Sequence, residues 1–296
     1  MSVAPTLSVI IVNYNTRDLL RTCLHSVFAS ILPGGLEVIV VDNQSHDGSA
    51  EMVETEFPQA ALIRSERNGG FAYGNNQGLH QARGRYALLL NPDTVVPPDA
   101  FAILTAFMDE HPEVGIVGPR LVRADGSLDL ACRRSFPTPE VSFYRIVGLS
   151  KLFPKSRRFA RYNLTYLDEH ELAEVDSVVG ACMMVRRQAM EQVGLLDEAY
   201  FMYGEDLDWA YRIKSHGWKV YYNPAATVLH YKRESSRQRP VRTIVEFYRA
   251  MLIFHRKHYA ARTFFLLNWL IVAGIYLRGG LALALNRLRP HEESMV

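Results

Sequence analysis

The sequence has few cysteines and no paired cysteine motif. The three thiols are odd in number, far apart and without CxxC spacing: Cys23, Cys132 and Cys182. A disulfide framework needs cysteines in pairs, and the common zinc sites need closely spaced thiols. The pattern therefore predicts a reducing compartment, the cytoplasm, and no zinc site.

Two nucleotide-binding signatures are also absent from the sequence. No GxGxxG follows the first apolar run, which disfavours a Rossmann dinucleotide site, and no GxxxxGK[ST] motif occurs, which excludes a P-loop NTPase. The N-terminal residues show no basic-then-apolar leader pattern. We therefore expect residues 7–12 to form a first buried strand rather than part of a signal peptide.

An excess of charge of either sign is missing as well. Lys and Arg number 33 against 31 Asp and Glu, for a net charge of +2 at pH 7. This balance argues weakly against a nucleic-acid partner. With 48% hydrophobic and 22% charged residues, the 296-residue chain is expected to fold as one substantial core, or as one large domain with an appendage.

The N-terminal part alternates short apolar runs with segments of helical periodicity. Strands are expected at 7–12, 36–41, 61–64 and 86–90, and helices at 17–29, 49–56 and 71–82. One helix between successive strands is typical of parallel βαβ units. The predicted fold class is therefore α/β, with a Rossmann-like, mostly parallel sheet flanked by helices.

Polar side chains follow three of these strands. Asn13 and Asn15 come after the first, Asp42 ends the second, and Asn91 and Asp93 follow the fourth. In a parallel sheet, ligands bind at the carboxyl ends of the strands. Each segment alone is equally well explained as a turn, but three at corresponding positions favour a binding site.

A second group of acids lies further along the chain. We expect a strand at 176–185, a short helix at 188–193 and a helix at 205–216. The last of these begins with Glu205, Asp206 and Asp208. Acids in a first helical turn stabilise the helix dipole, which is the alternative explanation. Three acids exceed what capping needs.

These residues belong to an ordered set of motifs. The set reads VNYN, VVDNQSHDGS, RNGGFAYGNNQG, LLLNPDTVV and GEDLDWAYR, and it spans about residues 8–230. It resembles the inverting family 2 glycosyltransferases with a GT-A fold, and among them the bacterial rhamnosyltransferases of cell-surface polysaccharide synthesis. The resemblance implies transfer of a sugar from a nucleotide-diphosphate donor, dTDP-rhamnose being favoured, to a hydroxyl of a glycan or lipid-linked acceptor.

The resemblance also implies donor-binding roles. Asp42 would accept hydrogen bonds from the base or ribose of the donor, and Asn13 and Asn15 would line the same pocket. Arg67 and Asn68 would reach the base or the diphosphate. The glycines that follow Asn68 allow close backbone approach to a ligand, or else close packing of a helix.

The same resemblance implies a divalent cation, Mg²⁺ or Mn²⁺, held by Asp93 as the last carboxylate of the family's DxD motif. Here the motif reads Asn91-Pro92-Asp93, so an amide that can bind the metal or the ribose replaces the first acid. A hard cation stabilises the charge that develops on the leaving diphosphate. His230 would be a further metal ligand or phosphate donor, or alternatively a structural histidine at a strand end.

The GEDLDW segment would carry the catalytic groups. By the family's pattern Asp206 is the base that deprotonates the acceptor, and Glu205 orients the acceptor or holds a nearby backbone group. Asp208 is expected to be structural and to pair with Arg212 one helical turn away. Trp209 would be either an apolar platform for the acceptor sugar or a core residue.

Two other functions share parts of this pattern. A sugar-1-phosphate nucleotidyltransferase also uses an α/β nucleotide fold and Mg²⁺, but the sequence lacks a glycine-rich, Arg- or Lys-bearing loop near its N-terminus. A non-catalytic nucleotide-sugar-binding module would not need the GEDLDW segment.

One internal segment, residues 133–174, is rich in cations. It is either a solvated basic loop or a flap on the acceptor side that faces anionic lipid or a pyrophosphate-linked acceptor. Its cations are Arg133, Arg134, Lys151, Lys155, Arg157, Arg158 and Arg161.

The composition changes after residue 231. We expect a glycosyltransferase domain at 1–231 and a helical segment at 232–296. The apolar stretch 264–277 has fourteen residues, short of the roughly twenty that cross a bilayer. Basic residues flank it, so residues 243–289 are predicted to lie on an anionic membrane surface at its cytoplasmic face. Packing on the main domain and homo-oligomer formation are the alternatives.

Overall fold

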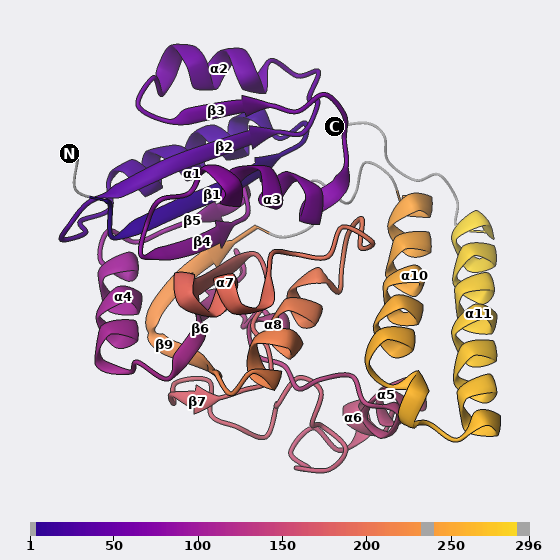
Figure 1. The fold of residues 1–296 in the computed structure, drawn as a ribbon. Coiled ribbons are helices and arrows are strands. Elements are labelled where there is room, and N and C mark those ends of the chain that lie inside the picture. Colours follow the sequence, from indigo (N-terminus) through magenta and orange to yellow (C-terminus); the bar gives the residue numbers. More distant parts are fainter. Residues whose placement is uncertain (1–3, 232–239, 289–296) are drawn as a thin grey trace.

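The computed structural model describes residues 4–231 and 240–288, and its N-terminal half alternates strands with helices (Figure 1). The elements are β1 (Leu7–Asn13), α1 (Arg17–Phe28), β2 (Leu36–Asp42), α2 (Ser49–Glu56), β3 (Ala61–Arg64), α3 (Gly70–Gln81) and β4 (Tyr86–Leu90). The pairs β3–β2, β2–β1 and β1–β4 are all parallel. The predicted βαβ units are therefore confirmed, because each helix carries the chain back to start the next parallel strand.

Residues 94–230 widen the same sheet. Its elements include β5 (Thr94–Val95), α4 (Ala100–Glu110), β6 (Val114–Val122), β7 (Ala173–Glu174), β8 (Cys182–Arg186), α7 (Arg187–Val193), α8 (Glu205–Ser215) and β9 (Lys219–His230). The strand order is β3-β2-β1-β4-β8-β6-β9-β5, with β7 paired to β9. β8 runs antiparallel to both of its neighbours, whereas β6 and β9 are parallel. The result is a mixed, mostly parallel sheet flanked by helices, as predicted.

The strand expected at 176–185 is too long. Only β8, Cys182–Arg186, is a strand, because backbone groups of the preceding residues bond to other partners. Asp176 N and Ser177 N donate to Arg134 O, and Gly180 N donates to the Asp206 carboxylate. These bonds place the segment before β8 at the candidate site.

Residues 123–172 form a mostly irregular insert between β6 and β7. It contains the short helices η1 (Leu130–Cys132), α5 (Pro139–Ile146) and α6 (Leu149–Leu152). The structure corrects the interpretation of the whole insert as a solvated loop, because Arg133 and Arg134 are buried. The remaining Lys and Arg residues between 133 and 174 are exposed.

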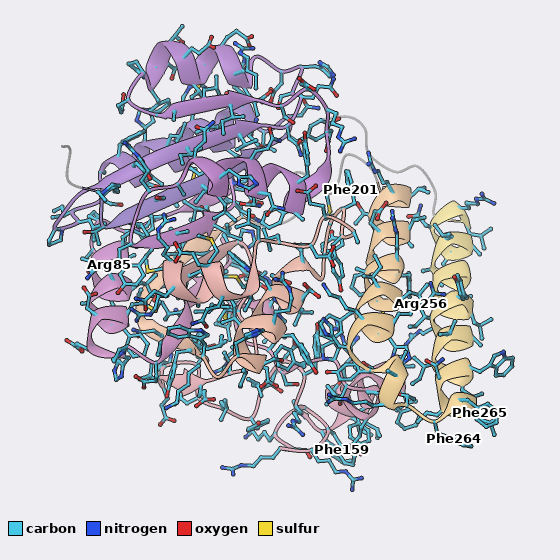
Figure 2. The ribbon with its side chains drawn as sticks, in the orientation of Figure 1. Arg85, Phe159, Phe201, Arg256, Phe264 and Phe265 are labelled. Atoms are coloured by element: carbon cyan, nitrogen blue, oxygen red, sulfur yellow. The ribbon has the colours of Figure 1, made fainter. Side chains whose placement is uncertain are left out.

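Two long helices stand side by side at one edge of the molecule, with α11 outermost (Figures 1 and 2). They are α10 (Pro240–His258) and α11 (Phe265–Leu288), joined through η2 (Ala260–Arg262). α10 packs on α8, where Tyr211 contacts the rings of Phe254 and His258. The apolar stretch predicted at 264–277 is thus part of a longer helix. Within the described residues, α11 is the one helix that is long and apolar enough to cross a membrane, judged by length and composition alone.

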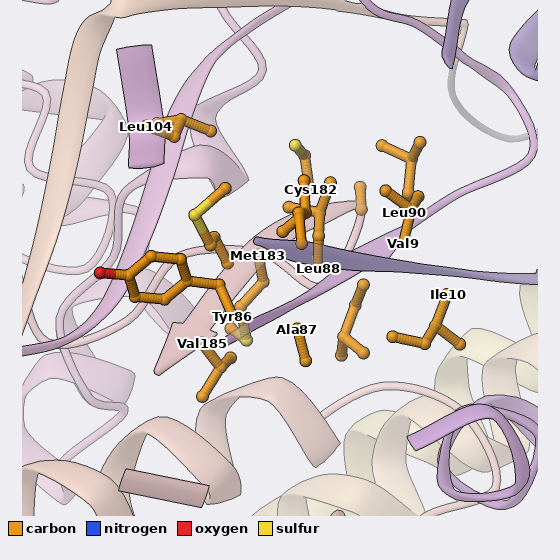
Figure 3. Close-up of a cluster of buried hydrophobic side chains, with 14 of the residues drawn as sticks. Val9, Ile10, Tyr86, Ala87, Leu88, Leu90, Leu104, Cys182, Met183 and Val185 are labelled. Atoms are coloured by element: carbon orange, nitrogen blue, oxygen red, sulfur yellow. The ribbon is translucent and has the colours of Figure 1, made fainter. Parts of the chain in front are cut away.

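The hydrophobic core lies between the sheet and its helices. Figure 3 shows its centre, where side chains of β4 and β8 meet those of β1 and α4. β1 and β4 are buried along their whole length, which explains their continuous apolar runs. Gly78 lets α3 approach this sheet, because a Cβ atom there would lie 2.5 Å from Ile10.

Candidate active site

The carboxyl ends of β1 and β2 form a buried polar cluster. Asn13 Nδ2 donates to Asp42 Oδ1 at 3.3 Å and to Ser45 Oγ at 3.1 Å, and Ser45 N donates to Asp42 Oδ2 at 3.0 Å. Asn15 Oδ1 accepts from His46 N at 2.8 Å. The structure therefore brings together Asn13, Asn15 and Asp42, as the sequence predicts for a pocket at this sheet edge.

Asn43 organises the glycine-rich loop beside that cluster. Its side chain donates to Asn68 Oδ1 and Gly70 O and accepts from Gly69 N. The sequence places this polar residue with Asp42 at the end of the second strand, but no role was predicted for it. Arg67 is exposed, and its guanidinium lies 4.9 Å from the centre of the Tyr73 ring. Asn68 is thus fixed by the fold, whereas Arg67 faces solvent.

The Asn91-Pro92-Asp93 motif meets His230 where β5 pairs with β9. Asp93 Oδ1 lies 3.3 Å from His230 Nε2, and Asn91 Nδ2 lies 3.4 Å from the same nitrogen. His230 Nδ1 lies 3.2 Å from Asp129 Oδ2. Burial disfavours a charged imidazole, but the two carboxylates outweigh it and raise the pKa of His230 to about 9. Asp129 is a functional candidate that no sequence motif indicated.

The acids at the start of α8 are buried, and each has a different environment. Asp206 Oδ2 accepts from Arg134 at 2.7 Å and from Gly180 N at 3.0 Å, and Oδ1 accepts from Leu207 N. Within the described part of the chain, Glu205 Oε2 has no hydrogen-bond partner. Burial first, and then the neighbouring Asp206 carboxylate, raise the pKa of Glu205 to about 8. Glu205 therefore holds a proton at neutral pH and presents one oxygen atom without a partner.

A tight turn before β8 joins the two acidic motifs. Gly180 donates its N–H to Asp206, and the next carbonyl, Ala181 O, accepts from Asn91 N at 2.9 Å. A Cβ atom on Gly180 would lie 3.1 Å from the Phe71 ring, so the start of α3 also closes on this turn. The donor-side motifs and the α8 acids thus meet in one place, although they lie far apart in sequence.

Asp208 and Trp209 of the GEDLDW segment are structural. Trp209 is fully buried, and its indole N–H donates to Gly194 O at 2.9 Å. That placement argues against the acceptor platform predicted for Trp209, because no ring face is left for a sugar. Asp208 pairs with Arg212 at 2.8 Å, as predicted, and also with Lys257 and His258 of α10.

The side chains of Asn91, Asp93 and His230 suit a divalent cation by their chemistry. Within residues 4–231 and 240–288, no three His, Cys, Asp or Glu side chains are arranged to hold a metal together. The chemistry still fits, since Mg²⁺ and Mn²⁺ need few protein ligands when a substrate diphosphate and water supply the rest. A carboxylate, an amide and an imidazole converge here, and Asp129 orients the imidazole from behind in the manner of metal-ligating histidines.

The structure and the sequence both match known glycosyltransferases. A solved mannosyltransferase from Pyrobaculum calidifontis, in complex with GDP-Man and Mn²⁺, superposes with a TM-score of 0.58 at 19% identity, over 95% of this chain and 72% of the other. The fold is the GT-A glycosyltransferase fold. Residues 4–243 match the family described as "Glycosyltransferase like family 2", and the chain belongs to this family.

Two relatives with described activities are similar to this chain in sequence. The chain is 27% identical over 274 residues, 88% of each protein, to an N-acetylglucosaminyl-diphospho-decaprenol L-rhamnosyltransferase of Mycobacterium tuberculosis. It is 30% identical over 213 residues to the low-salt glycan biosynthesis hexosyltransferase Agl10 of Haloferax volcanii, covering 70% of this chain and 61% of that protein. The protein is therefore a family 2 glycosyltransferase, and the nucleotidyltransferase and binding-module alternatives are set aside.

Proposed function

We propose that the protein transfers rhamnose from dTDP-rhamnose, with inversion at the anomeric carbon, to a hydroxyl of a lipid-linked glycan. The observation that carries the proposal is the turn at Gly180 and Ala181, which holds the Asp206 carboxylate beside the Asn91–Asp93 motif. An inverting transfer needs a base on one side of the anomeric carbon and the diphosphate on the other. This arrangement supplies a candidate for each side.

Asp206 is the proposed base. Its carboxylate would take the proton of the acceptor hydroxyl while the hydroxyl oxygen attacks the anomeric carbon and the nucleoside diphosphate leaves. No covalent enzyme intermediate is needed. Glu205 is proposed to orient the acceptor, because its Oε2 atom is without a partner among the described residues and its protonated carboxyl group can donate a hydrogen bond.

The donor is proposed to bind across the ends of β1, β2 and β4. Asn13, Asn15 and Asp42 would hold the base and ribose, and Arg67 and Asn68 would contact the base or diphosphate. The polar cluster at Ser45 supports the first assignment, because it fixes the amide and carboxylate groups before any ligand arrives. The exposure of Arg67 suits a side chain that must reach a mobile diphosphate.

Asp93, Asn91 and His230 are proposed to hold Mg²⁺ or Mn²⁺. When bound, the cation would offset the negative charge of the diphosphate. The solved relative that contains Mn²⁺ supports this choice by analogy of fold. Without the cation, Asp93 and His230 form a buried ion pair, since the imidazole carries a proton up to a pH near 9.

The rhamnosyl donor and the lipid-linked acceptor rest on the mycobacterial relative, whose name specifies both a rhamnosyl group and a diphospho-decaprenol. An acceptor of that kind lies in a membrane, so we propose that the protein works on the cytoplasmic face of a membrane. Contact with that membrane through residues 243–289, self-association and the domain boundary at 231 all remain predictions.

Two measurements test the function. Thermal melting with Mn²⁺ and dTDP-rhamnose, UDP-sugars or GDP-sugars should give the largest stabilisation with dTDP-rhamnose, because a ligand that binds the native state stabilises it. Radiolabelled dTDP-rhamnose and a lipid-diphosphate-linked sugar should then yield labelled lipid and free dTDP. If another nucleotide sugar stabilises the protein and dTDP-rhamnose does not, the proposed donor is wrong. Stabilisation by dTDP-rhamnose without transfer to any lipid-linked sugar would reject the acceptor.

A further inference from the structure

The outer side of α11 is covered with exposed apolar side chains. Phe265, Trp269 and Leu277 are 69%, 67% and 76% exposed. Figure 2 shows Phe264 and Phe265 at the end of α11 that adjoins η2, on the outside of the molecule. Single exposed apolar residues are ordinary, but a whole helix side of them marks an interaction surface.

A second group of exposed apolar side chains adjoins this helix from the insert. α5 and α6 lie at the same end of the α10–α11 pair (Figure 1), and Arg278 of α11 donates to Ile146 O of α5 at 3.1 Å. Leu152 and Phe153 are 70% and 46% exposed. The further exposed apolar residues of this group are Phe143, Ile146 and Val147. We call the exposed apolar residues of α5, α6 and α11 the apolar face.

The charges around the apolar face are almost all positive. η2 and α11 contain three Arg residues, Arg262, Arg278 and Arg287, and no acid. α10 contains four Lys and Arg residues and one acid, Glu246, which pairs with Arg249, whereas its Lys257 pairs with Asp197 and Asp208 on the side of α8. Residues 139–161 contain six Lys and Arg residues and one acid, Glu140, which pairs with Arg158. Exposed cations bordering an apolar side are complementary to an anionic lipid headgroup layer over hydrocarbon.

The contacts between α11 and α10 determine which orientation α11 can take relative to a bilayer. His255 Nε2 lies 2.7 Å from Asn268 Oδ1, and Gly279 lies against the ring of Tyr248, so one side of α11 is covered along much of its length. α10 in turn carries charged residues and is fixed to α8 through Asp208. If α11 crossed the hydrocarbon, α10 would have to follow with these charges or separate from it. An orientation in the plane of the interface leaves every one of these contacts intact.

We propose that the apolar face binds the anionic leaflet of a bilayer. In this arrangement α11 lies in the plane of the interface, and the exposed apolar residues of α5 and α6 enter the leaflet beside it. The two parts come from segments more than a hundred residues apart, so the surface exists only in the folded protein. The purpose of this membrane binding, but not the binding itself, rests on the proposed lipid-linked acceptor. Lipid binding is measured without turnover, so either proposal can fail without the other.

The test is flotation of the full-length protein with vesicles of phosphatidylcholine, with and without phosphatidylglycerol. Wild type should float with the anionic vesicles, less at high salt, and little with phosphatidylcholine alone. The triple variant Phe265→Ser, Trp269→Ser, Leu277→Ser should bind roughly tenfold more weakly or worse. The double variant Leu152→Ser, Phe153→Ser should also bind more weakly. All five side chains are exposed, so the fold should persist, which far-ultraviolet circular dichroism checks.

The matched control is Ile31→Ser, because Ile31 is 74% exposed and lies in the loop between α1 and β2, outside the apolar face. This variant should float like wild type. Undiminished flotation of the triple variant would overturn the proposal, and undiminished flotation of the double variant would remove α5 and α6 from the surface.

Two further results would replace the proposal with another. Retention of the protein in membranes after an alkaline carbonate wash would indicate a spanning α11, since that wash releases proteins bound at the interface. A wild-type dimer in sedimentation that the triple variant converts to monomer, without any flotation, would make the apolar face a contact between two copies of the chain.

Discussion

Arg134 donates a 2.7 Å hydrogen bond to Oδ2 of Asp206, and both side chains are buried. The same guanidinium group donates to Val178 O at 2.8 Å, so it also fixes the segment that leads to the Gly180 turn. The proposed base is therefore held in place by a residue of the insert that begins beside β6. A charge-assisted bond of this kind favours one rotamer of the carboxylate.

Replacement of the proposed base should stop the reaction without preventing donor binding. Asp206→Asn keeps the shape of the side chain but cannot accept the proton, so kcat should fall on the order of 10²–10⁴-fold. Stabilisation by dTDP-rhamnose with Mn²⁺ should change little. Asp125→Asn, at an exposed carboxylate away from the site, is the control. Near-normal turnover by Asp206→Asn would remove Asp206 from the mechanism.

Arg134 should act as a positioning residue for Asp206. Arg134→Met removes the donor that fixes the Asp206 carboxylate, so kcat should fall while stabilisation by dTDP-rhamnose stays near that of wild type, and Arg134→Lys should restore part of kcat. The other charged groups near this carboxylate, Glu205 and Asp208, are unchanged in these variants.

Arg133→Met provides a matched control for that experiment. Arg133 is the adjacent buried arginine, and it donates to the carbonyls of Leu167 and Asp168. The control should lose stability, because two carbonyl groups lose their donor, but its kcat should stay near that of wild type. An equal loss of kcat in both variants would indicate a general structural effect rather than positioning of Asp206.

Binding of the proposed cation should depend on Asp93 and, through His230, on Asp129. Asp93→Asn should abolish the Mn²⁺-dependent part of the stabilisation by donor, measured by thermal melting. Asp129→Ala keeps the converging groups but removes the side-chain partner of His230 Nδ1, so Mn²⁺ should bind about 10–100-fold more weakly. Activity in excess EDTA equal to that with Mn²⁺ would contradict the cation assignment.

Glu205 should make the stability of the protein depend on pH. Its pKa rises from an ordinary 4.5 to about 8 in the folded state, so the folded protein binds a proton that the unfolded chain has already released. The contribution of Glu205 to the free energy of unfolding is therefore fully present below pH 4.5 and declines as the pH rises towards 8. Relative to Glu205→Gln, wild type should lose on the order of a few kcal/mol over this range. Urea unfolding of both proteins between pH 4.5 and 8.5 checks this, and parallel curves would contradict it.

The sequence predicted the parts of the molecule that depend on neighbouring residues. The βαβ half follows from apolar runs and helical periodicity, and the site motifs lie at strand ends or a helix start, where local rules apply. Arg134 and Asp206, by contrast, are 72 residues apart, and Asp129 and His230 are 101 apart. Their contacts depend on the strand order β8-β6-β9, which no local pattern determines.

Two predictions from local pattern were wrong for the same reason. The run 176–185 has the composition of a strand, but its first residues bond to Arg134 and Asp206. Arg133 and Arg134 look like part of a solvated basic loop, but both are buried between the insert and the domain. In each case long-range contacts at the site outweighed local propensity.

The contact between α8 and α10 determines where the chain can be shortened. Burial opposes ionisation of Asp208, but hydrogen bonds from His258 and Lys257, together with Arg212, lower its pKa to about 2. A protein ending at residue 231 would lose His258 and Lys257 and leave the Asp208 carboxylate, two residues from Asp206, with Arg212 alone. A protein ending after Tyr259 would keep them and lose only the helix that carries most of the apolar face. For crystallisation or for assays in detergent-free buffer, the protein that ends after Tyr259 is therefore preferable.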